Sequence, residues 1–572
     1  MFGLHIVDIA ALALYFLGIT AVGVWSAKGV KSLSEFVMPR KFGKIMMMMH
    51  SFGTGTHSDQ AVSVASKSFT SGLSGIWYQW MWLFATPFYW LIAPMMRRFR
   101  AMTTADVFEA RFDHSVSVLF VLVGLGKFMM VIGMMLKGSG VIIEASSGGE
   151  LPENWMILIM TVMFVTYGLA GGLSAAIVTD FVQGLLTILF SFILLPVVLN
   201  AVGGMSGLRT ALPEVTGRDD MLSLVAPGEI GVFFILAIAL NSLLGIVVQP
   251  HNMGTCAAGK TEIEGAVGFM GGNMIKRFCT VAWCITGLAA IVYYKGDVGH
   301  PDQVYGMMAR EFLPIGMLGV FIAALLATVM GSCDSFMISA SGLFTRNIYQ
   351  HWKPEKSQTH YLWVARVSAL IVVTGGVLLA YTAEGVVKML EQMWKVDAMM
   401  AMAFWLGVFW RRTTVAGAWA ATLSAMLVWA ITSQGWFGQW VGGFNWAIDS
   451  GFIRESVKDG MTVRTVWLPW QMLAYISAGF AAGILVSLFS KPVAAEKLER
   501  FYNLLRTRVL PGEVLTEPCH LPEGATPGSR RVFFPNSQFE IPRPTWLAMS
   551  GFFAAWVMVA GIIGGVWWWV AV

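Results

Sequence analysis

The sequence of 572 residues predicts an all-α polytopic membrane protein with little soluble structure. Hydrophobic residues make up 56% of the chain and charged residues only 12%, whereas soluble domains carry roughly 25% charged residues. The mean hydropathy is +0.66. Apolar windows of about 20 residues, the length that crosses a bilayer, recur along the whole chain. Together these observations predict about 14 transmembrane helices.

The predicted spans follow one another with short connections. They lie near residues 5–27, 44–66, 72–96, 116–146, 154–172, 175–203, 229–252, 268–294, 315–345, 361–382, 386–410, 414–434, 466–490 and 545–571. No basic region precedes the first span, so we expect no cleavable signal peptide. The five cysteines show no metal-binding spacing, and the charge of +5 forms no single patch that would indicate nucleic-acid binding.

Basic residues predict the orientation of the chain. Lys and Arg concentrate in loops 28–44, 97–111, 346–366 and 491–544, whereas loops 147–153 and 204–228 are poor in them. Basic loops face the cytoplasm. This places both termini outside the cytoplasm, in the plasma (inner) membrane, and agrees with an even number of spans.

One segment inside a predicted span is unusually polar. Residues 53–60 read Gly-Thr-Gly-Thr-His-Ser-Asp-Gln. Backbone groups left free in lipid cost several kcal/mol each, so such a sequence predicts an interrupted helix whose free groups bind something. Interrupted helices at membrane depth form the ion and solute sites of many secondary transporters.

The chain also divides into two comparable halves, residues 44–203 and 229–410, each predicted to contain five spans. The second half begins with its own interrupted span, which carries Asn241, Ser242 and the sequence Gln249-Pro250-His251. Five is an odd number, so the second half enters the membrane from the opposite side, as in an inverted repeat. Around these halves we expect an N-terminal helix and loop (1–43), two peripheral helices (411–490), a cytoplasmic connector (491–544) and a C-terminal helix (545–572).

Six motifs in order resemble the sodium:solute symporter family. The strongest is the Gly-Gly…Thr-Asp-x-x-Gln pattern within residues 171–184; the others lie at 103–112, 249–251, 331–335, 409–414 and 497–507. The resemblance implies a LeuT-like five-plus-five inverted-repeat core. It also implies sodium-coupled symport of a small polar organic solute by alternating access, with sodium as the bound ion and no organic cofactor.

The resemblance also implies a sodium site between core helices 1 and 8. Gly53 and Thr56 would supply carbonyl oxygens, with the Thr328 carbonyl and the Ser332 hydroxyl opposite them. Gly331 stands where the family usually has a hydroxyl ligand, so one side-chain oxygen is missing. The alternative is that these small residues only allow close helix packing.

Two carboxylates suggest a second cation or proton site. Asp180, Asp334 and Ser335 are its candidate residues, because two nearby carboxylates in a low dielectric would bind a cation or share a proton. For Asp180 the alternative is a cap at the N-terminus of a helix.

Solute candidates surround the two interrupted spans. They are Gly55, His57, Asp59, Gln60, Asn241 and Ser242, each of which has the alternative of a structural hydrogen bond. Lys137 and Lys395 are further candidates because lysine is expensive inside a membrane and would hold a carboxylate. Lys127 is expected to reach the cytoplasmic surface.

Three other functions compete with sodium symport. Proton-coupled symport keeps the fold and uses Asp180 and Asp334. A transporter-derived solute sensor needs an output domain, and the sequence shows no sizeable cytoplasmic one. An enzyme needs a nucleophile–base or metal constellation, and none stands out.

Overall fold

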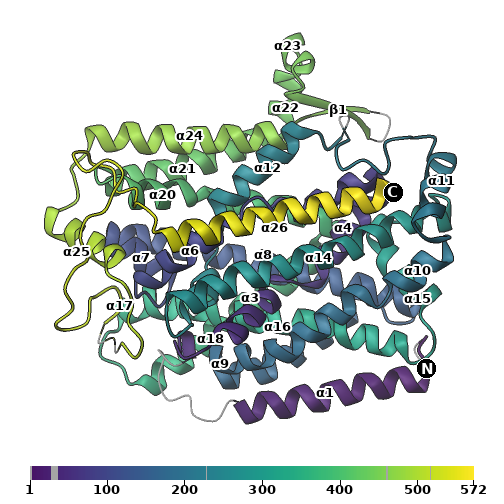
Figure 1. Ribbon diagram of the computed structural model, residues 1–572, viewed down its shortest axis with the longest axis horizontal. Coiled ribbons are helices and arrows are strands. Elements are labelled where there is room, and N and C mark those ends of the chain that lie inside the picture. Colours follow the sequence, from purple (N-terminus) through teal and green to yellow (C-terminus); the bar gives the residue numbers. More distant parts are fainter. Residues whose placement is uncertain are drawn as a thin grey trace.

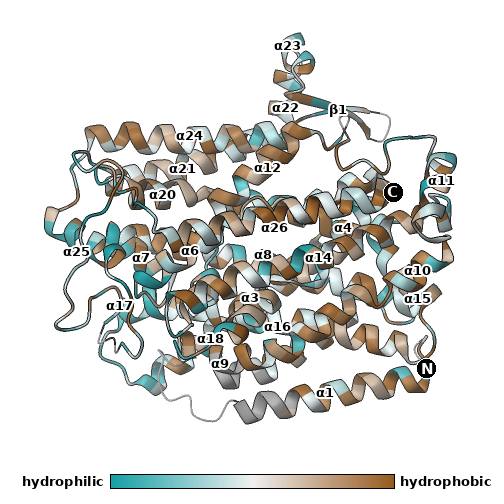
Figure 2. Ribbon diagram, in the orientation of Figure 1, coloured by the Kyte–Doolittle hydropathy of each residue, from teal (hydrophilic) through white to brown (hydrophobic). Residues whose placement is uncertain are grey.

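The computed structural model describes residues 3–26, 36–226, 229–458, 461–513, 515 and 517–571. Its long helices lie roughly side by side (Figure 1), and both chain termini lie at one end of the bundle. Apolar residues dominate the middle of the bundle and hydrophilic residues gather at its ends (Figure 2). This is the layering that a bilayer imposes. The prediction of an all-α polytopic fold is confirmed.

The first predicted repeat begins with a divided helix. It contains α3 (Lys44–Gly55), α4 (Ser58–Ser71), η1 (Gly72–Ile76), α5 (Trp77–Trp80), α6 (Thr86–Arg98), α7 (Thr104–Arg111), α8 (His114–Ser147), α9 (Glu153–Phe192) and α10 (Leu195–Ala201).

The second predicted repeat begins with a divided helix too. After α11 (Gly204–Thr216) come α12 (Val232–Gly245), η2 (Ile246–Val248), α13 (Asn252–Ala257), α14 (Glu262–Tyr294), η3 (Pro301–Gln303), α15 (Val304–Phe312), α16 (Met317–Phe344), η4 (Thr345–Tyr349), α17 (Gln350–Trp352), α18 (Gln358–Thr382), α19 (Val386–Met399) and α20 (Ala401–Phe409).

The remaining elements lie outside both repeats. They are α1 (Ile6–Ser26), α21 (Val415–Thr432), α22 (Gly435–Val441), α23 (Asn445–Asp449), β1 (Ile453–Lys458), β2 (Met461–Val466), α24 (Leu468–Phe489), α25 (Ala495–Arg506) and α26 (Trp546–Ala571). Strands β1 and β2 pair as an antiparallel hairpin between α21 and α24. This hairpin was not predicted from the sequence.

Local sequence fixes where several helices begin. Thr103 and Asp106 form a reciprocal capping box at the start of α7, and Thr261 and Glu264 form another at the start of α14. Asp113 caps α8 by accepting a hydrogen bond from the Val116 backbone N–H at 3.1 Å. Each cap satisfies backbone donors that have no partner inside the helix.

Among the described residues, eight helical segments are long and apolar enough to cross a membrane, and three shorter apolar segments lie at Ile6–Ile19, Glu153–Thr166 and Val232–Val248. The predicted spans at 44–66, 72–96 and 386–410 are each divided into shorter helices instead: α3 and α4, α5 and α6, and α19 and α20. The count of 14 spans stays a prediction.

One predicted boundary differs from the structure. The sequence predicts separate spans at 154–172 and 175–203, but helical structure continues from Glu153 to Phe192 as α9. Apolar segments still lie on either side, at Glu153–Thr166 and Ala176–Ala201. The burial of Gly171, Gly172 and Ser174 in the family-like motif lies outside what the structure describes.

The basic loops share one end of the molecule. Helices α7, α17 and α25, which belong to the basic segments 97–111, 346–366 and 491–544, lie at the end opposite to the chain termini (Figure 1). The connector after α25 is tied to this end. Glu540 is largely buried and accepts hydrogen bonds from Arg411 at 2.7 Å, Arg506 at 2.8 Å and Arg530 at 3.0 Å.

Candidate ion and solute site

The polar segment at residues 53–60 interrupts a helix, as the sequence predicts. Helix α3 ends at Gly55 and α4 begins at Ser58, and Thr56 and His57 between them have extended backbone conformations. Thr56 is fully buried, and its hydroxyl Oγ1 has no hydrogen-bond partner among the described residues. We refer to Gly53–Gln60 as the first break.

Three of the four residues of the predicted sodium site, Gly53, Thr328 and Ser332, lie on two helices that touch, and Thr56 follows directly after α3. Ser332 on α16 donates a hydrogen bond to the Gly53 carbonyl at 3.0 Å and to the Thr328 carbonyl at 3.1 Å. A single hydroxyl thus lies within 3.1 Å of two of the three predicted carbonyl ligands, and Gly53, Thr328 and Ser332 are all buried. Carbonyl and hydroxyl oxygens are ligands for hard cations.

Asp180 on α9 lies beside the same junction. Its Oδ2 is 2.6 Å from Nδ1 of His50 and accepts a hydrogen bond from the Thr54 hydroxyl at 3.2 Å. The Thr54 hydroxyl is also 3.4 Å from the Ser335 hydroxyl, so Ser335 joins the cluster. The other carboxylate oxygen, Oδ1, is buried and has no hydrogen-bond partner among the described residues. The cap alternative for Asp180 is wrong, because α9 begins at Glu153.

Gly331 leaves a space that neighbouring oxygens occupy. A Cβ at this position would lie 2.8 Å from Oδ1 of Asp180 and 2.6 Å from Oε1 of Gln183. Both of these oxygens are buried without a hydrogen-bond partner among the described residues. Where the family-like pattern loses a hydroxyl ligand, the structure therefore brings two other side-chain oxygens next to the same turn of α16.

Asp334, the second predicted carboxylate, has a different environment. Its Oδ1 accepts a hydrogen bond from the backbone N–H of Ser335 at 2.7 Å. Its Cβ lies close to Gly168, and a Cβ added at that glycine would be only 3.1 Å away. Asp180 thus contacts residues of α3, whereas Asp334 contacts residues of its own helix α16 and of α9.

On the other side of the first break, the Gly55 carbonyl accepts two hydrogen bonds. Lys276 on α14 donates from Nζ at 2.5 Å, and Gln60 on α4 donates from Nε2 at 3.1 Å. Gln60 also lies 3.2 Å from Nε2 of His57, and Nδ1 of His57 contacts Oδ1 of Asp59. Four of the predicted solute candidates, Gly55, His57, Asp59 and Gln60, are therefore directly connected.

A cavity of about 70 Å³ opens beside these groups. Its lining includes Gln60, Gln79, Lys127, His251, Lys276 and Trp394. Several of the lining polar atoms are buried without a hydrogen-bond partner among the described residues: Oε1 of Gln60, Oε1 of Gln79, Nδ1 of His251, Nε1 of Trp394 and the Tyr89 hydroxyl. Such orphaned groups are costly unless a ligand or water satisfies them.

Comparison with known proteins identifies the family. The model of the sodium:solute symporter family matches residues 36–425, which is more than half of the chain. The chain belongs to the sodium:solute symporter family. It is a multi-pass membrane transporter of small solutes and not an enzyme.

Similar proteins carry different solutes. The osmoregulated proline transporter OpuE of Bacillus subtilis is 24% identical over 449 residues, covering 74% of this chain and 89% of the relative. Sodium/myo-inositol cotransporter 2 of Sus scrofa is 25% identical, covering 74% and 69%. The sodium/glucose cotransporter of Vibrio parahaemolyticus is 23% identical, covering 73% and 83%.

The fold is that of solved relatives. The structure of a Na⁺-coupled sialic acid symporter in a substrate-bound, outward-open state aligns with a TM-score of 0.67 at 17% identity, covering 86% of this chain and 99% of the other. The predicted LeuT-like fold is confirmed.

Five predicted solute candidates of this symporter do not line the cavity. Asp59 is fully buried and contacts His57. Asn241 donates to the Trp394 carbonyl at 3.0 Å and accepts from the Tyr475 hydroxyl at 2.5 Å. Ser242 donates to the Ile238 carbonyl within its own helix. Lys137 forms an ion pair with Glu153 at 2.7 Å. Lys395 is buried on α19.

Three residues of the candidate site were not singled out from the sequence. His50 lies one turn of α3 before the first break, and the run of four methionines ahead of it disguises its polar environment. Gln183 was noted only as part of a motif. Lys276 was missed because nothing in the sequence shows that α14 packs against the first break. Lys127, expected at the surface, lines the cavity and is 4% exposed.

The second break, Ile246–Asn252, is built differently. After the short turn η2, residues Gln249–His251 separate α12 from α13. Asn252 donates from Nδ2 to the Ile246 carbonyl at 2.8 Å, and the same group lies 3.4 Å from Oε1 of Gln249. A side chain from within this break therefore supplies the hydrogen bond to the free Ile246 carbonyl.

Proposed function

We propose that sodium is the coupling ion and that it binds at the first break, between α3, α9 and α16. The observation that carries this proposal is the position of the Ser332 hydroxyl, which lies within 3.1 Å of the carbonyls of Gly53 and Thr328. The carboxylate oxygen Oδ1 of Asp180, buried and without a hydrogen-bond partner among the described residues, approaches the adjacent Gly331. A sodium ion at this junction would take lone pairs from these oxygens in place of the present hydrogen bonds.

This arrangement links ion binding to alternating access. Helix α3 and helix α16 belong to different repeats, and the ligands of one ion would come from both. Bound sodium would hold the two helices together in the state that admits solute, and loss of sodium to the cytoplasm would let them separate. We further propose that the basic end of the bundle faces the cytoplasm, with both termini on the outer side of the plasma membrane.

Thermal unfolding against salt tests the ion site. A ligand that binds only the folded state raises stability with its concentration. We expect saturable stabilisation of the purified protein by NaCl, and none by KCl or choline chloride at equal ionic strength. Ser332→Ala should lose this response. Ser341→Ala is the matched control, because Ser341 is buried on the same helix and, among the described residues, its hydroxyl bonds to the Ile338 carbonyl alone. Equal sodium responses of wild type and Ser332→Ala would refute the assignment.

Proton coupling is a second candidate, favoured by the contact of 2.6 Å between His50 and Asp180. A proton shared between His50 and Asp180 could take the place of a sodium ion beside this carboxylate. Uptake driven by an imposed pH gradient in sodium-free buffer, and abolished in His50→Gln, would establish it. Uptake that requires sodium at every pH would exclude it.

A further inference from the structure

Two histidines and a glutamate meet at the basic end of the bundle. They are Glu109 on α7, His114 at the start of α8 and His351 on α17, and both α7 and α17 lie at the end opposite to the chain termini (Figure 1). Their nitrogen and oxygen ligand atoms all lie within 4.8 Å of one another. Imidazole nitrogens together with one carboxylate are typical ligands of zinc. The three residues are far apart in the sequence, which is why no metal-binding spacing reveals them there.

The Glu109 carboxylate contacts both imidazoles. Its Oε1 is 2.8 Å from Nε2 of His351, and its Oε2 is 3.5 Å from Nδ1 of His114. The two imidazole rings stack with their centroids 4.1 Å apart. Ligand atoms about 2.1 Å from a tetrahedral zinc ion lie roughly 3.4 Å from each other. Small rotations of these side chains would therefore place all three ligand atoms around one ion.

A buried hydrogen bond one helical turn away holds Glu109 and His351 close together. Asn347 is fully buried and donates from Nδ2 to Oδ1 of Asp106 at 2.7 Å, and Asp106 is itself fixed by the capping box of α7. Glu109 follows Asp106 by three residues, and His351 follows Asn347 by four. Residues with this spacing share one face of a helix. The packing of these segments therefore brings the two ligands together before any ion binds.

The direction of the His351 side chain depends on a wider helical turn. The backbone N–H of Gln350 donates to the carbonyl of Thr345, five residues earlier, so η4 is a turn of π-helix. Such a turn contains one residue more than a turn of α-helix, which rotates the residues after it by about 100°. Single π-helical turns within helices are frequent at functional sites.

The site is open to solvent and is not strongly charged. The side chains of His114 and His351 are 43% and 37% exposed, so a water molecule can reach the position of a fourth ligand. Lys497 on α25 interacts electrostatically with Glu109, and this lysine opposes binding of a cation by charge alone. A metal ion that binds through imidazole nitrogen suits these surroundings better than one that prefers carboxylates.

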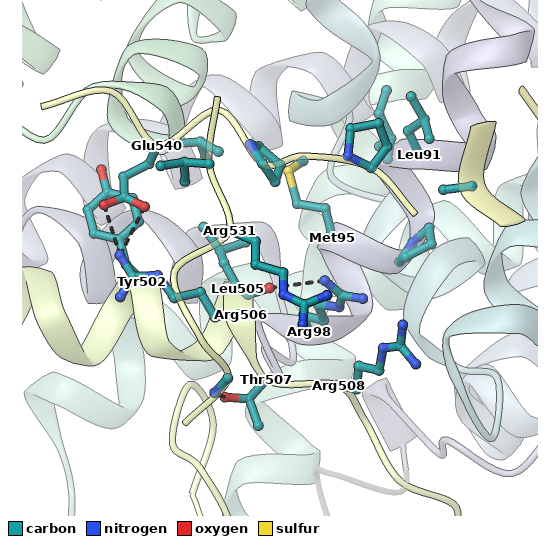
Figure 3. Close-up of a pocket in the computed structure, with 18 of the residues that line it drawn as sticks. Leu91, Met95, Arg98, Tyr502, Leu505, Arg506, Thr507, Arg508, Arg531 and Glu540 are labelled. Carbon is teal, nitrogen blue, oxygen red and sulfur yellow. Dashed lines mark hydrogen bonds and ion pairs between the residues drawn. The ribbon is translucent and has the colours of Figure 1, made fainter. Parts of the chain in front are cut away.

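The larger crevice at the same end of the bundle is built from ion pairs instead. This crevice, of about 1520 Å³, lies between α6, α20, α25 and the connector that follows α25. Arg98, which lines it, pairs with Glu262 at 2.8 Å, and Arg506 donates to Glu540, as Figure 3 shows. A guanidinium group has no lone pair to offer a metal. These arginines therefore neutralise carboxylates, whereas the histidines beside Glu109 add ligand atoms to one.

We propose that Glu109, His114 and His351 bind a zinc ion, with water as the fourth ligand. Magnesium and calcium would be excluded, because both prefer oxygen ligands. The ligands come from α7 and α8 of the first repeat and from α17 of the second, so bound zinc would restrain movement between these elements. The site shares no residue with the proposed ion and solute site and does not rest on the proposed function.

Zinc binding to the purified full-length protein, prepared without a histidine tag, tests the proposal. We expect one zinc ion per chain in isothermal titration and no binding of magnesium. His114→Gln, His351→Gln and Glu109→Gln should each weaken zinc binding by at least about tenfold, because even residues that only orient metal ligands contribute 10–100-fold to affinity. His520→Gln is the matched control, since His520 is also exposed beside a carboxylate, that of Glu517 at 3.6 Å.

Cobalt(II) provides a second measurement, because its visible absorption reports the geometry of its ligands. We expect the spectrum of four-coordinate cobalt in the wild type and its loss in His351→Gln.

The outcomes are separable from those of the sodium experiments, because Ser332→Ala should bind zinc as the wild type does. Equal zinc affinities of the wild type and the three ligand variants would overturn the proposal. An equal loss in His520→Gln, or binding of magnesium as tight as that of zinc, would overturn it too.

Discussion

The two breaks differ in where their partners come from. At the first break, Ser332 from α16 and Lys276 from α14 donate to backbone carbonyls, and Asp180 from α9 packs against Gly53. At the second break, Asn252 from within the break donates to the Ile246 carbonyl. The first break therefore depends on three other helices, whereas the second satisfies this carbonyl itself. This difference is the reason for placing the proposed ion site at the first break, where distant elements supply the polar contacts, and not at the second.

The largest effect is expected at the carboxylate of the first break. Asp180→Asn removes the charge beside Gly53 and Gly331 and disrupts the contact with His50. Because a buried charged partner contributes about 3 kcal/mol, we expect sodium affinity to fall by roughly a hundredfold in isothermal titration. Asp302→Asn is the control, since Asp302 is also buried but binds the backbone N–H of Val386. Unchanged sodium affinity in Asp180→Asn would remove Asp180 from the site.

A variant at the second break should affect stability alone. Asn252→Ala leaves the Ile246 carbonyl without its donor, which costs about 1–3 kcal/mol of unfolding free energy. We expect a lower midpoint of thermal unfolding with the sodium affinity of the remaining folded protein unchanged. A weaker sodium affinity in this variant would mean that both breaks contribute to the ion site, and the comparison would fail.

Gly331→Ala should have an intermediate effect at the first break. The added methyl group would lie 2.6 Å from Oε1 of Gln183 and 2.8 Å from Oδ1 of Asp180. Both atoms end flexible side chains, so they can turn away at a cost of about 1 kcal/mol. We expect sodium affinity to fall several-fold in the same titration. Gly564→Ala on α26 is the control, because a Cβ there meets nothing within 4 Å. It should leave the sodium affinity unchanged.

The smallest effect is expected outside both breaks. Lys137→Gln removes a partly exposed ion pair with Glu153, which contributes at most about 1 kcal/mol. Sodium-driven uptake should stay at the wild-type rate in proteoliposomes. A large loss of uptake would return Lys137 to the solute path.

The sequence predicts the breaks better than it predicts their partners. Gly53, Gly55 and His57 interrupt an apolar stretch, and that local pattern is enough to locate the first break. Ser332 and Asp180 were predicted only because they lie in the family-like motifs. No local pattern shows which face of α14 meets α3, so Lys276 went unnoticed while Lys137, equally unusual in a span, was chosen instead. The two lysines differ in the residues they contact, and those contacts depend on how the helices pack, which the sequence alone does not show.

Radiolabelled sodium binding to variants of the two breaks would show whether the ion binds at the first break. Equilibrium binding would be measured for wild type, Ser332→Ala, Ser341→Ala and Asn252→Ala at equal amounts of folded protein. We expect at least about tenfold weaker binding, or about 1.4 kcal/mol, for Ser332→Ala alone. Wild-type binding by Ser332→Ala, or an equal loss in Asn252→Ala, would contradict the assignment of the ion site to the first break.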